Sequence, residues 1–223
     1  MPSHSAESAR RSHRDRIYDL TIGRIQRGEI GRGDRLVDTT LAAELGVSRM
    51  PVRDALMRLA HEGYLVPTTR GFMIPTPSPA EVLEVFEIRR LLEPRAAAGA
   101  AQALDAAGLA RLETAVADAR RAVDDGDIGL FFRASVAFRD GWLSAVPNRS
   151  LQETIRRYLA QVQAVRLATM RDSASQAVIL RGQQDLLACF RQGDALAAAD
   201  RMLRFVVEGE TRFLALLAPE AGA

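Results

Sequence analysis

Two arginines near residue 50 have the type and spacing that nucleic-acid binding requires. Arg49 and Arg53 lie four positions apart in a segment with helical periodicity, so both side chains project from one face. A guanidinium group binds phosphate oxygens or the O6 and N7 edge of guanine. Val52, Leu56 and Leu59 form the opposite, apolar face, which would pack against the protein. The pattern predicts a helix that presents two cations outward; a merely solvated face is the alternative.

The segments around this helix predict a helix-turn-helix followed by a wing. A helix over 8–27 precedes a short helix capped by Asp38, a tight turn at Leu45-Gly46-Val47, and a third helix from Ser48 to about His61. Extended pieces at 64–66 and 72–74 form a hairpin through 68–71. Such an arrangement places the third helix in the major groove of DNA. From this face, the helix start and the hairpin tip, the expected DNA contacts are Ser48, Arg49, Met50, Arg53 and Arg70.

The rest of the chain predicts only helices. The proline-rich stretch 75–79 marks a boundary, and Ser78-Pro79-Ala80-Glu81 is a strong helix start. Helical periodicity then covers 79–103, 107–125, 127–145, 148–171, 174–192 and 194–216, with caps expected at Asp105, Asp127, Asn148, Ser173 and Asp194. We expect a mainly α protein: a tail (1–7), a winged helix-turn-helix (8–75), a linker (76–79) and an antiparallel α-helical bundle (80–218).

Composition limits the compartment and the class of partner. The net charge is +2, but residues 1–75 hold 12 arginines against 9 acidic residues, so the basic excess lies where DNA contacts are expected. No apolar run approaches the roughly 18 residues of a membrane span, and the polar N-terminus does not resemble a secretory signal. The single cysteine suits a reducing compartment. These features favour a cytoplasmic protein without membrane contact.

The N-terminal residues resemble a known family. Leu41-Ala-Ala-Glu-Leu-Gly-Val-Ser-Arg-Met-Pro-Val-Arg-Asp-Ala-Leu56, followed by Arg58-Leu59 and Glu62-Gly63, closely resembles the winged helix of GntR-family transcription regulators. The resemblance implies a homodimer that binds double-stranded DNA at a pseudo-palindromic operator, acts as a repressor and responds to an effector. It also implies that Ser48, Arg49 and Arg53 contact DNA, together with Thr39 of the second helix and the wing residues Thr69, Arg70 and Gly71.

The C-terminal part is similar to the FadR subgroup, whose effector domain, called FCD, is an antiparallel helical bundle. The similarity lies in Phe86–Glu93, Ala137-Phe138, Asn148–Leu151 and Gly193-Asp194. Many such domains hold a divalent metal through one Asp and three His. The resemblance places those positions at Ser135, Arg139, Gln183 and Phe205, and the chain has no histidine after residue 61. We therefore expect no metal and no cofactor.

An arginine at position 139 suggests a different ligand. A guanidinium group binds carboxylate or phosphate through two parallel hydrogen bonds. We expect Arg139 to anchor a small anionic effector in a pocket lined by Arg89, Glu93, Ser135, Trp142, Gln183 and Phe205. Alternatively, Arg139 pairs with Glu93 or another acid and binds no ligand.

Two other classes of function remain as alternatives. A ligand-independent architectural or interaction protein would have a degenerate pocket. An enzyme is disfavoured because the bundle has no histidine, no glycine-rich phosphate loop and no nucleophile beside a credible base.

Overall fold

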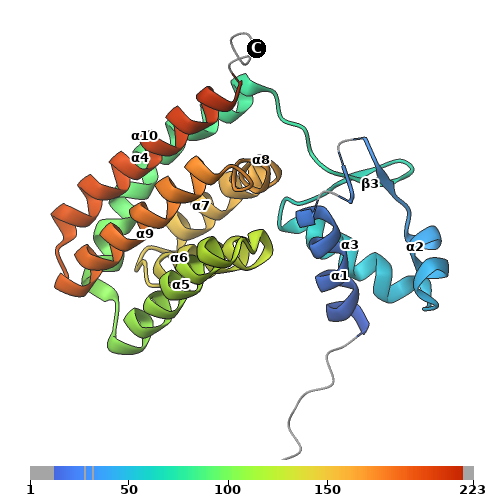
Figure 1. Cartoon of the computed structure of the whole chain (residues 1–223), viewed down its shortest axis with the longest axis horizontal. Coiled ribbons are helices and arrows are strands. Elements are labelled where there is room, and N and C mark those ends of the chain that lie inside the picture. Colours follow the sequence, from blue (N-terminus) through green and yellow to red (C-terminus); the bar gives the residue numbers. More distant parts are fainter. Residues whose placement is uncertain (1–12, 28, 32, 218–223) are drawn as a thin grey trace, which may run out of the picture. The chain divides into compact units, whose positions relative to one another are not determined.

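The computed structural model describes residues 13–27, 29–31 and 33–217. The chain divides into two compact units, an N-terminal unit of residues 1–75 and a C-terminal unit of residues 76–223 (Figure 1). Within the described ranges, no helix is long and apolar enough to cross a membrane. The expected tail at 1–7 and the first residues of the helix expected from Ser8 lie outside the described residues.

The N-terminal unit contains three helices and a small antiparallel sheet. Its elements are α1 (His13–Arg27), β1 (Arg35–Leu36), α2 (Asp38–Leu45), α3 (Arg49–His61), β2 (Val66–Thr68) and β3 (Gly71–Met73). The strand order is β1-β3-β2, with Arg35 opposite Met73 and Thr68 opposite Gly71. The winged helix-turn-helix expected from the sequence is confirmed.

Two local expectations in this unit are wrong, one about the strands and one about Asp38. β2 lies two residues later than the expected strand at 64–66, and β3 lies one residue earlier than the expected strand at 72–74. The strand β1 was not expected. Asp38 does not cap α2, because the N-cap is Val37 and Asp38 occupies the first turn. Ser48 is the N-cap of α3, but its side chain makes no capping hydrogen bond.

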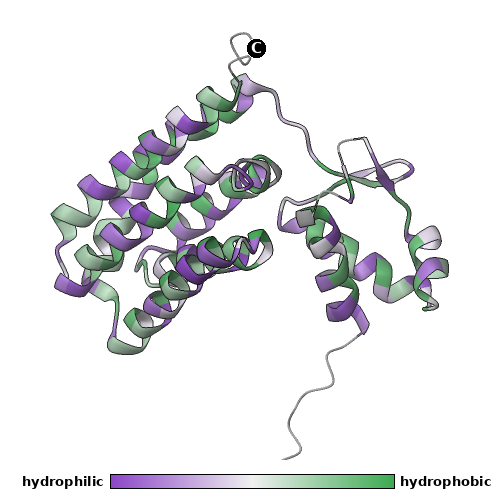
Figure 2. Ribbon diagram, in the orientation of Figure 1, coloured by the Kyte–Doolittle hydropathy of each residue, from purple (hydrophilic) through white to green (hydrophobic). Residues whose placement is uncertain are grey.

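The C-terminal unit is a bundle of helices. They are α4 (Pro79–Ala103), α5 (Ala106–Asp125), α6 (Ile128–Ser144), α7 (Arg149–Gln161), α8 (Gln163–Thr169), α9 (Ser173–Gln192) and α10 (Ala195–Leu217). Helices α4 and α10 pack side by side, as do α5 and α6 (Figure 1). Apolar and polar residues alternate along these helices (Figure 2), as in helices that bury one face. The core includes the fully buried Phe131, Phe132, Phe138, Phe190, Leu112, Leu143 and Leu186.

One long helix expected over 148–171 is in fact two. Val162, with φ −107° and ψ 10°, leaves the helical conformation between α7 and α8. Val162 and Leu167 are both buried, yet five residues on a continuous helix turn through about 140°, so their side chains would point to different sides. The break allows both side chains to pack inward.

Helix starts in the C-terminal unit follow ordinary capping rules. Ser78 and Glu81 form a reciprocal capping box at the start of α4. Asp105, Asp127 and Asn148 cap the next helices as expected. The expected cap Ser173 is wrong, because Asp172 accepts hydrogen bonds from the backbone and hydroxyl of Ser175 and pairs with Arg212 at 2.6 Å. Those hydrogen bonds, first that of the Ser175 hydroxyl and then that of Arg212, lower the pKa of Asp172.

Candidate DNA-binding face and effector cavity

Helix α3 has the two faces that its sequence predicts. Val52 and Leu56 are completely buried. Arg49 and Arg53 are exposed, and so is Met50, which retains 65% of its accessible surface. The apolar face therefore fixes the helix to the N-terminal unit and leaves the arginines available to a partner.

Arg49 is positioned by a contact that the sequence did not indicate. Its Nε lies 2.9 Å from Oδ2 of Asp38, which begins α2. The hydrogen bond from Arg49 is the main cause of a lowered pKa at Asp38, and the charge of Arg53 adds to it. The ion pair crosses the turn between the two helices, so it orients Arg49 and joins α2 to α3.

Another arginine of α3 has a structural role. The guanidinium of Arg58 stacks over the ring of Tyr18 at 4.1 Å, and its Nε donates to Glu62 at 2.9 Å. Burial, followed by the hydrogen bond to Glu62, raises the pKa of Tyr18 above its ordinary range. These contacts attach α1 to α3 and occupy Arg58 within the N-terminal unit.

The remaining expected DNA contacts are at the surface. Thr39 lies in the first turn of α2, Ser48 begins α3, and Thr69 and Arg70 form the exposed tip of the wing. Gly71 follows with φ +120°, and a Cβ there would lie 2.4 Å from the carbonyl oxygen of Leu36. Glycine is therefore required where β3 approaches β1, which fixes the base of the wing.

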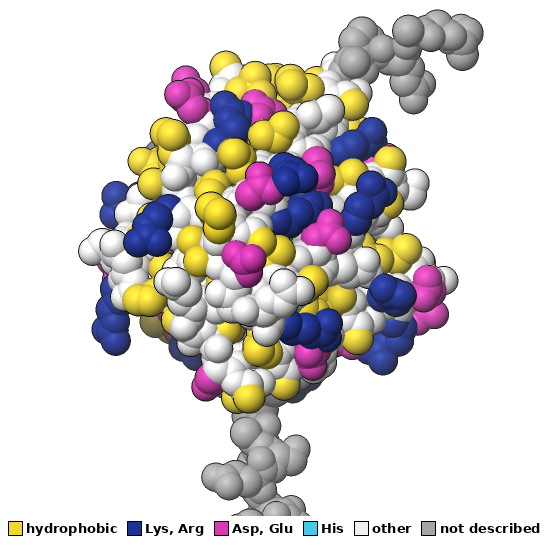
Figure 3. Space-filling view, turned by 90° about the vertical axis from the view of Figure 1, so that its left-hand side faces the viewer, with side chains coloured by type: hydrophobic (Ala, Val, Ile, Leu, Met, Phe, Trp, Pro, Cys, Tyr) yellow, Lys and Arg dark blue, Asp and Glu magenta, His cyan; other side chains and the backbone are white. Residues whose placement is uncertain are grey.

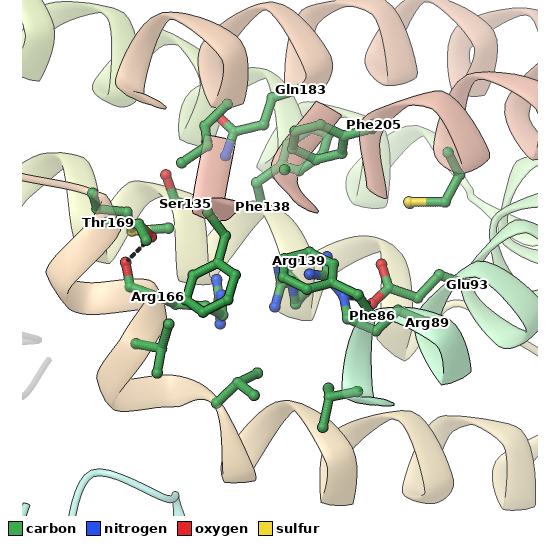
Figure 4. Close-up of a pocket in the computed structure, with 18 of the residues that line it drawn as sticks. Phe86, Arg89, Glu93, Ser135, Phe138, Arg139, Arg166, Thr169, Gln183 and Phe205 are labelled. Carbon is green, nitrogen blue, oxygen red and sulfur yellow. Dashed lines mark hydrogen bonds and ion pairs between the residues drawn. The ribbon is translucent and has the colours of Figure 1, made fainter. Parts of the chain in front are cut away.

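All seven residues expected to bind the effector line one cavity in the C-terminal unit. Figure 4 labels each of them except Trp142. The cavity has about 90 Å³ of space that the centre of a water molecule can reach, enough for several waters or a small metabolite. Arg89 and Glu93 come from α4, and Ser135, Arg139 and Trp142 from α6. The other lining residues were not expected from the sequence; they are Val82, Val85, Phe86, Phe138, Val162, Val165, Arg166, Thr169, Met170, Ile179, Met202, Gly209 and Phe213.

Helices α9 and α10 close the cavity with Gln183 and Phe205. The ring of Phe205 lies against Gly182, where a Cβ would approach it to 2.3 Å. A larger residue at position 182 would push the ring away from α9. Gly182 therefore allows Phe205 to pack beside Gln183 at the cavity wall.

The cavity has an excess of positive charge. Arg89, Arg139 and Arg166 line it together with a single acid, Glu93, among the described residues. Arg89 Nε donates to Glu93 Oε1 at 2.6 Å, and these side chains are only 10% and 2% exposed. Burial alone would raise the pKa of Glu93, but attraction to Arg89, and then to Arg139, outweighs it and lowers the pKa. Glu93 is therefore a buried carboxylate among three cations.

The face of the molecule in Figure 3 has arginine and acidic side chains interleaved with apolar ones. On that face the arginine side chains do not form a broad basic surface.

Two polar side chains of the cavity lack partners within the described part of the chain. Ser135 Oγ and Gln183 Oε1 are buried and make no hydrogen bond there. Their residues are 3% and 2% exposed. Such atoms lose their hydration without receiving a protein partner in return.

The four positions that the resemblance assigns to metal ligands do come together, but their side chains do not fit a divalent cation. Arg139 would repel the ion, and Phe205 has no donor atom. Within the described residues, no group of three His, Cys, Asp or Glu side chains could hold a metal.

Comparisons with known proteins agree with both units. The profile "Bacterial regulatory proteins, gntR family" matches residues 13–71, and the profile "FCD domain" matches residues 84–208. An uncharacterized HTH-type regulator of Streptomyces ambofaciens is 25% identical over 88% of this chain and 83% of its own. The repressor RspR of Escherichia coli is 26% identical over 82% of each chain.

McbR of Escherichia coli is similar in sequence and in fold. It is 32% identical over 56% of this chain and 55% of its own. The solved structure of McbR/YncC superposes with a TM-score of 0.72, covering 92% of this chain and 99% of that one at 23% identity. With both profiles matched in order, this chain belongs to the GntR family of DNA-binding bacterial transcription regulators and carries an FCD domain behind its winged helix.

Proposed function

We propose that the protein is a homodimeric repressor whose affinity for a pseudo-palindromic operator is changed by a small anionic metabolite. The metabolite would bind in the cavity of the C-terminal unit, with Arg139 as its principal anchor. The single observation that carries the effector part is the cluster of three arginines around one glutamate inside that cavity.

The arginine cluster supports an anionic ligand on energetic grounds. Removing cations from water is costly unless opposite charges compensate them, and among the described lining residues Glu93 supplies only one. The net positive charge of the cavity would attract a carboxylate or phosphate, which would accept hydrogen bonds from Arg139. A ligand-independent protein would have no use for this charge imbalance, so the cavity favours the effector-responsive function.

The exposed face of α3 supports the DNA contacts. Arg49, Arg53 and the hydroxyl of Ser48 lie at the N-terminal end of the helix. Backbone N–H groups at such an end attract phosphate. Arg70 at the tip of the wing would reach the minor groove or the DNA backbone.

An apolar stripe on α10 supports the homodimer. Leu196, Leu203, Val207, Leu214 and Leu217 are each at least 40% exposed and recur at intervals of three, four or seven residues. This spacing forms a seam that suits another helix, and a twofold dimer buries the same patch of both copies. The occupant of the stripe would be α10 of a second copy.

The dimer proposal is tested by light scattering after gel filtration of the full-length protein. Leu203→Glu should reduce the mass from that of a dimer to the 24.4 kDa of one chain. Leu20→Glu, an exposed leucine of α1, serves as the control and should remain dimeric. If the Leu203→Glu protein remains dimeric, the apolar stripe of α10 is excluded as the dimer interface.

The regulatory proposal is tested with duplexes selected from a random library by the full-length protein. A footprint should reveal two symmetric half-sites about one DNA turn apart. Arg53→Gln should weaken binding, whereas Arg120→Gln, an exposed arginine of α5, should not. Small organic acids should change the operator Kd of the wild type but not that of Arg139→Leu. An asymmetric footprint, or equal responses of both proteins to the acids, would contradict the proposal.

A further inference from the structure

The unsatisfied atoms of Ser135 and Gln183 restrict the ligand beyond its charge. Ser135 and Arg139 are four residues apart on α6, so their Cβ atoms lie about 5–6 Å from one another. In Figure 4, Ser135 and Gln183 lie on one side of Arg139, and Arg89 and Glu93 on the other. The cavity thus offers a polar subsite one helical turn from its cationic anchor.

The chemistry of the two side chains selects the group that fits this subsite. A serine hydroxyl donates or accepts, and the buried Oε1 of Gln183 only accepts. A second carboxylate would accept from Ser135 but offer no proton to Gln183. An ammonium group would donate to both, but the excess of arginine in the cavity would repel it. A ligand hydroxyl donates to Gln183, accepts from Ser135 and carries no charge.

We infer that the effector is a small hydroxy acid. Its acidic group contacts Arg139, with Arg166 of α8 as a second cation, and its hydroxyl lies between Ser135 and Gln183. The rings of Phe86 and Phe205 cover the carbon skeleton. The limited volume of the cavity favours a skeleton of a few carbons. The inference rests on the proposed function, because it assumes that the cavity is the effector site.

Matched acids test the hydroxyl requirement by isothermal titration of the full-length protein. The probes are 2- and 3-hydroxybutanoate, butanoate and 2-aminobutanoate, together with malate, succinate and aspartate. Two added hydrogen bonds should make the better hydroxy acid of each set bind roughly 10- to 30-fold more tightly than its deoxy partner. The amino acids should bind no better than the deoxy acids.

Substitutions then assign the subsite. Gln183→Leu and Ser135→Ala should each reduce the ratio of the deoxy-acid Kd to the hydroxy-acid Kd to below about threefold, with circular dichroism confirming a folded protein. Gln184→Leu changes the next residue of α9, which does not line this cavity, and should leave the ratio intact. Arg139→Gln should weaken both acids and thereby report on the anchor separately.

The possible outcomes separate the hydroxyl, the subsite and the effector function. Equal binding of hydroxy and deoxy acids would overturn the hydroxyl inference and leave the anionic effector standing. A preference that survives Gln183→Leu and Ser135→Ala would overturn the assigned subsite. At about 10 mM acid, even a millimolar Kd gives nearly full occupancy. Failure of every acid to bind at that concentration would overturn the proposed effector function together with this inference.

Discussion

Separate replacements of Arg89 and Arg139 should affect different properties. Arg89→Leu should mainly lower the free energy of unfolding, whereas Arg139→Leu should mainly weaken ligand binding. Arg89 is the direct hydrogen-bond partner of Glu93, which is only 2% exposed. Removing one member of a buried ion pair typically costs about 3–5 kcal/mol. Since Arg139 and Arg166 also attract Glu93, we expect Arg89→Leu to cost about 2–3 kcal/mol of unfolding free energy, below that range.

Arg139→Leu leaves the pair between Arg89 and Glu93 in place and keeps most of the apolar stem of the side chain. We therefore expect it to cost less than half as much as Arg89→Leu. Arg139→Leu should reduce the free energy of ligand binding more than it reduces the free energy of unfolding, because a hydrogen bond to a charged group contributes about 1.5–3 kcal/mol. That free energy corresponds to a rise of roughly 10- to 150-fold in the Kd of an anionic ligand.

The only tryptophan of the chain provides the assay. Trp142 lines the cavity and is 2% exposed, so its fluorescence reports both unfolding of the C-terminal unit and ligand binding. Urea titrations without ligand give the stability of each variant, and titrations with an acid that binds the wild type give its Kd. If Arg139→Leu were as destabilising as Arg89→Leu and bound the acid normally, Arg139 would be a structural counterion of Glu93 and the reasoning would be refuted.

Other predictions concern DNA binding, the wing and pH. Arg53→Gln should reduce the slope of log K against log salt by about 1, measured by fluorescence anisotropy; an unchanged slope would exclude a phosphate contact. Gly71→Ala should destabilise the N-terminal unit by more than about 1 kcal/mol, whereas Gly31→Ala, which has space for a Cβ, should be tolerated; equal melting temperatures would refute this. The pKa of Asp172 is lowered, chiefly by the Ser175 hydroxyl, so its contribution is present above the ordinary carboxyl pKa and lost as pH falls through the folded value. In Asp172→Asn, the free energy of unfolding should therefore fall less steeply as the pH is lowered below the ordinary carboxyl pKa. The same steepness as in the wild type would contradict this.

The predictable features depend on local periodicity. The spacing of Val52 and Leu56 fixes which face of α3 is buried, and therefore which face presents Arg49 and Arg53. Similarly, the four-residue spacing of Ser135 and Arg139 places both on one side of α6. Since these relations lie within single helices, the sequence alone was sufficient to predict them.

The missed features depend on contacts between distant elements. Nothing in the residues around Val162 breaks a helix, yet Val162 leaves the helical conformation in the structure, and both it and Leu167 are buried. Arg166 of α8 lines the cavity together with Val162. The ion pair between Arg49 and Asp38 likewise joins residues from two different helices. Tertiary packing decides such features, and local pattern does not encode it.

The position of Arg89 and Glu93 on α4 suggests how an occupied cavity would influence the linker. Helix α4 begins at Pro79, immediately after the proline-rich connector, and its first turn is held by the capping box of Ser78 and Glu81. Ten residues of helix, about 15 Å, separate Pro79 from Arg89. An anion at Arg139 would weaken the attraction of Arg139 for Glu93. Because a capped helix resists fraying at this end, a resulting shift of Glu93 and Arg89 would reach the connector as a displacement of the whole segment. We therefore expect the capping box to contribute to regulation as well as stability: Ser78→Ala should weaken the effect of a bound acid on operator Kd more than it weakens acid binding itself.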